Sequence, residues 1–256
     1  MLTTLMLASM ITVPHSAAGL PPRSHWIACA VITMAFAAGA RLLRGTNRSG
    51  TVAGALVSFL LCVCEGPGAF AVLLSLFVVS FAATRVGRSR KERLGAAEQR
   101  DGRKASQVLA NLGIGTLAAL VYAIRAHNPL LILATTAALA EAAADTVSSE
   151  MGTAVNERSH LITNWKAVPA GTDGGITFTG TLAGFFAALA LSTVAGMTRL
   201  IPWEWVPLAA AAGTLGMLVD SFLGATLERR ALLDNDKVNF LSTFAAAIIA
   251  FLLVRL

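Results

Sequence analysis

The chain has 256 residues, of which 55% are hydrophobic and 13% are charged, and its mean hydropathy is +0.69. A soluble domain carries about 25% charged residues, so this composition argues against a soluble enzyme and predicts an integral membrane protein. The formal net charge of +6 does not indicate a nucleic-acid partner. Most basic residues lie in loops between apolar blocks, where they set membrane orientation.

Apolar blocks of about 14–20 residues, near the length that crosses a bilayer, follow one another along the chain. The first block, Leu2 to Val13, lacks a basic flank, so we interpret it as a short span or re-entrant segment rather than a cleaved signal peptide. We expect an all-α fold, a polytopic transmembrane helical bundle of about 8–9 membrane segments, with residues 1–256 as one domain. The spans predicted after the first block are 26–41, 51–64, 69–84, 108–124, 130–145, 176–196, 207–227 and 238–255.

The basic residues are distributed unequally between the two sets of loops. Segment 85–107 alone carries eight of the 20 Lys and Arg residues. If this loop is cytoplasmic, loops 41–50, 145–175 and 228–237 fall on the same side, and 16 of the 20 basic residues face the cytoplasm. This asymmetry predicts the orientation. We expect a protein of the cell (plasma) membrane of a prokaryote, with its active site facing the cytoplasm.

Polar residues gather at the predicted cytoplasmic ends of four spans. Asp145 and Glu150 follow one span, Asp220 lies inside another, and Asn111 and Asn239 open two more. Ionisable residues at this depth are costly and usually face a polar cavity. Carboxylates beside a basic loop suit a Mg²⁺ ion that holds phosphates, because Mg²⁺ prefers hard oxygen ligands. We therefore predict Asp145, Glu150 and Asp220 as metal ligands and catalytic residues, with helix capping as the alternative role for Asp145.

The segment K-A-V-P-A-G-T-D-G-G-I-T-F-T-G-T, residues 166–181, is rich in glycine and threonine. Successive backbone N–H groups in such turns form anion-binding nests, and the helix that begins here directs its N-terminus at the same side. An ordinary turn before a helix is the alternative. The chain has no P-loop motif, so this segment would hold phosphate in another way. The residues predicted for this cradle are Lys166, Gly171, Thr172, Gly174, Gly175 and Thr177.

Four ordered motifs resemble those of one integral membrane family, which includes the plant phytyl-phosphate kinase of vitamin E synthesis. They are A-D-T-V-S-S-E-M-G (144–152), G-T-D-G-G-I-T-x-x-G (171–180), D-S-F-L-G-A-T-L-E (220–228) and V-N-F-L-S (238–242). N-R-S-G-T-V-A-G (47–54) and R-K-A-S-Q-V-L-A-N (103–111) also fit. The resemblance covers 45–256, whereas 1–25 match poorly. It implies site residues at Gln107, Asn111, Asp145, Ser149, Glu150, Gly171, Thr172, Asp173, Gly174, Gly175, Asp220, Ser221 and Asn239, and Glu228 departs from the family pattern.

The resemblance implies a membrane kinase. It would transfer phosphate from a nucleoside triphosphate, with CTP favoured, to phytyl, geranylgeranyl or farnesyl phosphate, with Mg²⁺ as cofactor. Arg103 would bind phosphate, although orientation of the loop is the alternative role. Other candidate functions are a CTP-dependent polyprenol kinase, a cytidylyltransferase that makes a CDP-lipid and, less in keeping with a one-sided site, a transporter. The expected partners are the isoprenyl-phosphate lipid, the nucleotide and membrane lipids, without nucleic acid, and the sequence leaves a homodimer open.

The orientation can be tested by cysteine labelling in intact cells. In Gly95→Cys and His160→Cys proteins, the new thiol should resist an impermeant reagent added outside and react after permeabilisation, because both positions lie in predicted cytoplasmic loops. The unsubstituted protein, whose three cysteines lie in apolar blocks, gives the background. Rapid labelling of either variant from outside would overturn the orientation.

Overall fold

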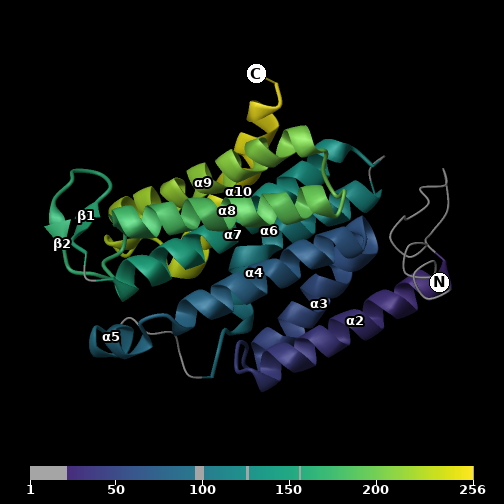
Figure 1. Cartoon of the computed structure of the whole chain (residues 1–256), viewed down its shortest axis with the longest axis horizontal. Coiled ribbons are helices and arrows are strands. Elements are labelled where there is room, and N and C mark those ends of the chain that lie inside the picture. Colours follow the sequence, from purple (N-terminus) through teal and green to yellow (C-terminus); the bar gives the residue numbers. More distant parts are fainter. Residues whose placement is uncertain (1–21, 96–100, 125–126, 156, 256) are drawn as a thin grey trace.

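The computed structural model describes residues 22–95, 101–124, 127–155 and 157–255. In this part of the chain, eight long helices form a bundle and are long and apolar enough to cross a membrane (Figure 1). They confirm the eight spans predicted after the first block, whereas Leu2 to Val13 and residues 96–100 lie outside the described ranges. The helices are α2 (Arg23–Leu42), α3 (Arg48–Glu65), α4 (Pro67–Arg85), α6 (Ala105–Ile124), α7 (Pro129–Ala154), α8 (Phe178–Met197), α9 (Val206–Leu223) and α10 (Asn235–Leu253).

Several helices begin at side chains that cap their first backbone N–H groups. Asn47 accepts from Gly50 N at the start of α3, and Thr177 accepts from Gly180 N at the start of α8. Asp234 accepts in the same way from Lys237 N at the start of α10. Each cap satisfies a donor that the helix leaves unpaired, which fixes where the helix begins.

Helix α7 lies at the centre of the bundle and packs against α4, α6, α8, α9 and α10. Its side chains from Leu133 to Ala144 are all buried, and most of them are alanine. Small side chains let neighbouring helices approach closely. At Gly213 of α9, for example, an added Cβ would lie 3.0 Å from the backbone nitrogen of Glu141. The central position of α7 therefore depends on small residues on both sides of the contact.

Helix α7 also extends further than predicted. We expected a loop from residue 145, but the helix continues to Ala154, about two and a half turns beyond Asp145. The hydroxyls of Thr146 and Thr153 donate to the carbonyls of Ala142 and Ser149 within the helix, so these polar groups need no loop to be satisfied. The motif that begins at Ala144 is thus helical, and Asp145 does not cap the helix end.

The loops to which we assign the basic residues meet at one end of the bundle. We call this region, which consists of the described residues of loops 43–47, 86–104, 155–177 and 229–234, the basic end. Asn47 N donates to Arg103 O at 3.0 Å, Arg90 Nε donates to Thr153 O at 3.2 Å, and Lys104 pairs with Asp236 at 3.8 Å. These contacts join loop 43–47 to segment 86–104, and they join that segment to the last turn of α7 and the first turn of α10.

The basic end also carries elements that the sequence did not predict. Figure 1 shows the short helix α5 (Arg88–Arg93) and the hairpin of β1 and β2 at this end. Strands β1 (Ser159–Leu161), β2 (Ala167–Val168) and β3 (Gly175–Ile176) form an antiparallel sheet in the order β2-β1-β3. The glycine-rich segment thus belongs partly to a small sheet, although the membrane region is helical as expected.

Helix α9 ends in a π-helical turn, η2 (Gly224–Glu228), directly after the D-S-F-L part of its motif. Such turns are frequent at functional sites. Gly174 of the glycine-rich loop lies against η2 with φ +70°, and an added Cβ there would meet Ala225 N at 2.2 Å. Only glycine allows both this conformation and this approach, so the loop is seated on the end of α9.

Candidate active site

Three carboxyl groups lie together inside the bundle near the basic end. Asp145 of α7 and Asp220 of α9 have their carboxyl groups within hydrogen-bonding reach of each other, and Glu141 lies one turn above on α7. Ser242 Oγ of α10 donates to Asp220 Oδ2 at 3.1 Å. We call Glu141, Asp145 and Asp220 the acidic cluster. Two carboxylates in contact repel each other unless a proton or a cation lies with them, so Asp145 and Asp220 require one or the other.

Glu141 is the most deeply buried member of the acidic cluster. Its side chain is 1% exposed, and its Oε1 atom has no hydrogen-bond partner among the described residues. Gly216 of α9 makes room for it, because an added Cβ at 216 would lie 2.6 Å from Glu141 Cγ. A buried polar atom without a partner is costly, which indicates a ligand or water at this position.

Beside the acidic cluster lies a cavity of about 350 Å³, which we call the polar cavity. Its walls come from α6, α7, α10 and the loop between α5 and α6, and they are polar on nearly every side. The structure brings seven predicted site residues together here. The lining residues are Gly95, Arg103, Gln107, Asn111, Asp145, Thr146, Ser149, Glu150, Asn235 and Asn239.

Arg103 is held at the rim of the polar cavity by its backbone. Arg103 N donates to Gly45 O at 3.1 Å, and Arg103 O accepts from Asn47 N. Gly50 allows this approach, since an added Cβ there would meet Arg103 O at 2.0 Å. The guanidinium donates to Thr146 Oγ1 at 3.3 Å and acts electrostatically on Asp145. The N-R-S-G motif thus places a cation beside the acidic cluster.

Glu150 lies on another wall of the polar cavity and has a cation of its own. Lys91 of α5 is 1% exposed, and its Nζ donates to Ala83 O and Thr84 O at 3.0 Å each and to Glu150 Oε2. Within the described ranges, no group of three or more His, Cys, Asp or Glu side chains is arranged to hold a metal ion. Asp145 and Asp220 lie together in the acidic cluster. Glu150, which we predicted as a third metal ligand, is instead paired with Lys91.

The glycine-rich loop does not line the polar cavity. The Lys166 side chain is exposed, Thr172 Oγ1 donates to Pro169 O, and Thr177 caps α8. Gly171 and Gly174 have positive φ angles, and Gly175 belongs to β3. Asp173 acts electrostatically on Glu228, so this loop contacts the site through η2 and not as a wall of the cavity. Ser221 also lies outside the lining, and its hydroxyl donates to Met217 O.

The N-terminus of α8, where the sequence suggested a bound anion, holds the protein's own carboxylate. Glu157 Oε1 accepts from Phe178 N and Glu157 Oε2 accepts from Thr179 N, both at 3.1 Å. The hydrogen bonds from Thr179, and then that from Phe178, hold the pKa of Glu157 below its usual range. A phosphate at these two N–H groups would first have to displace Glu157.

Several residues that line the polar cavity, and Lys91 beside it, were not among the predicted site residues. Thr146 follows Asp145 directly, and Asn235 lies one turn before Asn239 on α10, so helical spacing from predicted residues could have identified both. Lys91 could not have been singled out, because it is one of eight basic residues in a loop whose charge already has a topological explanation. Only the fold shows that this lysine is buried.

A family model described as "Integral membrane protein DUF92" matches residues 31–247. The chain belongs to this family. Among its DUF92 relatives, an uncharacterised membrane protein of Methanocaldococcus jannaschii is 34% identical over 82% of this chain and 86% of that protein. An uncharacterised membrane protein of Synechocystis is 35% identical over 71% and 72% of the two chains. Protein VTE6 of Arabidopsis thaliana, which is named as chloroplastic, is 31% identical over 83% of this chain and 66% of that protein. No solved structure matches this DUF92 chain.

The two lysine pairs at the basic end should differ greatly in their contribution to stability. Lys91→Met leaves Glu150 without its cation in a largely buried position, which should lower the free energy of unfolding by about 3–5 kcal/mol. Lys104→Met removes an exposed partner of Asp236 and should cost less than about 1 kcal/mol. Unfolding of both variants in detergent measures the difference. Equal losses would show that Lys91 is not buried as described.

Proposed function

We propose that this chain is a membrane kinase that phosphorylates an isoprenyl monophosphate to the diphosphate, with a nucleoside triphosphate, CTP favoured, as phosphate donor. The observation that carries the proposal is the polar cavity, in which residues of separate family-like motifs meet beside the acidic cluster. The ordered motifs resemble those of the phytyl-phosphate kinase family. In the orientation predicted from the basic loops, the cavity faces the cytoplasm, where a nucleotide is available.

Two members of the acidic cluster would hold the Mg²⁺ ion that this chemistry requires. Mg²⁺ is commonly bound through one or two carboxylates together with substrate phosphates, and Asp145 and Asp220 are two carboxyl groups in contact. These two residues would hold the ion, which would neutralise the negative charge of the substrate phosphates. Glu150, which is paired with Lys91, would instead shape the opposite wall of the cavity.

The remaining cavity residues are suited to position phosphates. Arg103 would bind a phosphate oxygen, and Gln107, Asn111, Ser149 and Asn239 would orient the two substrates by hydrogen bonds. The glycine-rich loop, including Gly174, would act indirectly by fixing η2 behind Asp220.

Phosphoryl transfer in this site would need no strong general base. An oxygen of the acceptor phosphate attacks the γ-phosphorus, the bond from that phosphorus to the β-phosphate oxygen breaks, and a nucleoside diphosphate leaves. The acceptor is already an anion near neutral pH, since the second pKa of a phosphate monoester is about 6. This agrees with a cavity whose lining includes no histidine among the described residues.

Isosteric substitution of the acidic pair should separate catalysis from folding. Asp145→Asn and Asp220→Asn should each lower turnover by at least about 10²-fold, with melting in detergent unchanged or raised, because a buried charge is removed. Glu65→Gln is the matched control. Glu65 is also a partly buried carboxyl residue of a span, but it ends α3 at the side of the bundle away from the basic end, where Thr135 donates to it at 2.7 Å. Activity should therefore persist. An Asp220→Asn protein with the original rate would remove Asp220 from the site.

The reaction itself is tested by supplying labelled nucleotides and matched acceptors to the purified protein. Phytyl or geranylgeranyl monophosphate should be phosphorylated with release of a nucleoside diphosphate. The free alcohol should react about 10⁴-fold less well, because polar groups built for a phosphate would be left unpaired. Equal use of the alcohol would make the protein a polyprenol kinase, and release of pyrophosphate would make it a cytidylyltransferase. No reaction with any nucleotide would refute the kinase proposal.

A further inference from the structure

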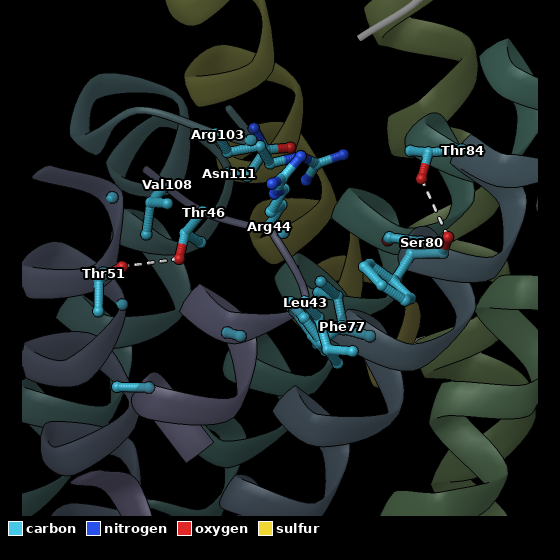
Figure 2. A pocket seen from close by; sticks show the side chains of 18 of the residues that line it. Leu43, Arg44, Thr46, Thr51, Phe77, Ser80, Thr84, Arg103, Val108 and Asn111 are labelled. Carbon is cyan, nitrogen blue, oxygen red and sulfur yellow. Dashed lines mark hydrogen bonds between the residues drawn. The ribbon is translucent and has the colours of Figure 1, made fainter. Parts of the chain in front are cut away.

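A second cavity, of about 390 Å³, lies between α2, α3, α4 and α6. We call it the apolar groove. Seven leucine and phenylalanine side chains line it, among them Leu73, Leu76 and Phe77. Figure 2 shows Leu43 and Phe77 among the lining residues. Helix α2 packs on α3 and reaches α4 through the Phe36 ring, which lies edge-on to Phe70 and Phe77 at 5.6 and 5.3 Å. The outermost helix of the bundle therefore covers a space suited to a hydrocarbon chain.

The mouth of the apolar groove is positively charged. Arg44, Arg85, Arg88 and Arg103 line it at the basic end. Arg88 is neutralised by Glu92 at 3.1 Å. Arg85 instead lies over the Phe81 ring and donates to the carbonyls of Phe81 and Leu43, and the Arg44 guanidinium has no ion pair with a described residue. This mouth favours an anionic group above an apolar tail.

Below the mouth, the groove wall contains a hydroxyl that lacks a partner. Ser80 of α4 is 5% exposed, and its Oγ atom has no hydrogen-bond partner among the described residues. Figure 2 shows Ser80 on the same side of the groove as Thr84, and Arg44 and Phe77 line the same groove. Since an unsatisfied buried hydroxyl costs about 1–3 kcal/mol, an oxygen of a ligand at this position would restore the lost hydrogen bond.

The apolar groove adjoins the polar cavity. Arg103 and Asn111 line both spaces, so an amphiphile in the groove would bring its head group to the cavity that contains Asp145. A nucleotide that enters the polar cavity from water would meet that head group at Arg103. The two cavities thus have the arrangement that a reaction between a lipid and a water-soluble substrate requires.

We propose that the apolar groove binds the single isoprenoid chain of the acceptor, with its monophosphate at Arg44, Arg85 and Ser80 beside Arg103. This assignment rests on the proposed function. The chain would enter from the bilayer between α2 and α4, where Phe36 contacts Phe70 and Phe77. Groove depth below the arginines would then select the chain length.

Gly54 offers a direct test, because it lines the groove from α3 and an added Cβ would meet no atom within 4 Å. Gly54→Leu should therefore fill part of the groove without a clash. The KM for geranylgeranyl monophosphate should rise about 10- to 200-fold relative to that for farnesyl monophosphate. Gly39→Leu is the matched control, since Gly39 of α2 also faces open space but lies outside the groove lining. Gly39→Leu gains the same helix propensity and should leave the ratio of the two KM values unchanged.

Binding can be measured independently of turnover with a geranylgeranyl monophosphate that carries a photoreactive tail. Crosslinks in the full-length protein should map to α2, α3, α4 or α6 and should decrease in Gly54→Leu but not in Gly39→Leu. Crosslinks elsewhere, or equal behaviour of the two variants, would overturn the groove assignment even if the kinase is active. Equal capture of phosphatidic acid with a photoreactive chain would overturn the assignment to an isoprenoid. Crosslinks in the groove without any phosphoryl transfer would support the groove and refute the proposed function.

Discussion

Carboxyl groups on a helix that is surrounded by other helices must receive their polar partners from those neighbours, and this requirement organises the whole molecule. Helix α7 carries Glu141, Asp145 and Glu150 through the centre of an apolar bundle. Each group depends on the polar partners that adjacent elements supply. α9 and α10 bring Asp220 and Ser242 to the acidic cluster, and α5 brings Lys91 to Glu150. Loops 43–47 and 101–104 fasten Arg103 beside them.

The membrane spans could be predicted because burial in lipid leaves a continuous apolar pattern that needs no knowledge of neighbours. The grouping of Asn111, Asp145 and Asn239 could be predicted for a related reason. Once orientation is fixed by basic residues, alternation of spans places these side chains at one depth. Sequence patterns therefore predicted the features that the bilayer itself controls, which are the spans and the depth of their polar residues.

The remaining features depend on contacts between distant segments, and the sequence could not reveal them. Residues 145–154 looked like a loop because they are polar, but neighbouring helices and internal hydrogen bonds keep them helical. The glycine-rich loop is predicted as a phosphate cradle from its composition, whereas two of its contacts appear only in the fold: Glu157 accepts from the first N–H groups of α8, and Gly174 packs on η2. Composition does not reveal such contacts, because they depend on where the chain places distant residues.

Because α7 is long, the thickness of the bilayer affects the depth at which the site lies in the membrane. Its 26 residues extend about 39 Å, whereas the hydrocarbon layer is about 30 Å thick. If α7 begins at the opposite edge of that layer, its last turns, which carry Ser149 and Glu150, reach into the head-group layer. A thinner membrane would raise the polar cavity toward water, and a thicker one would draw it under the lipid head groups or tilt the bundle. Lipid composition could thus act on this protein by setting the depth at which its two cavities meet.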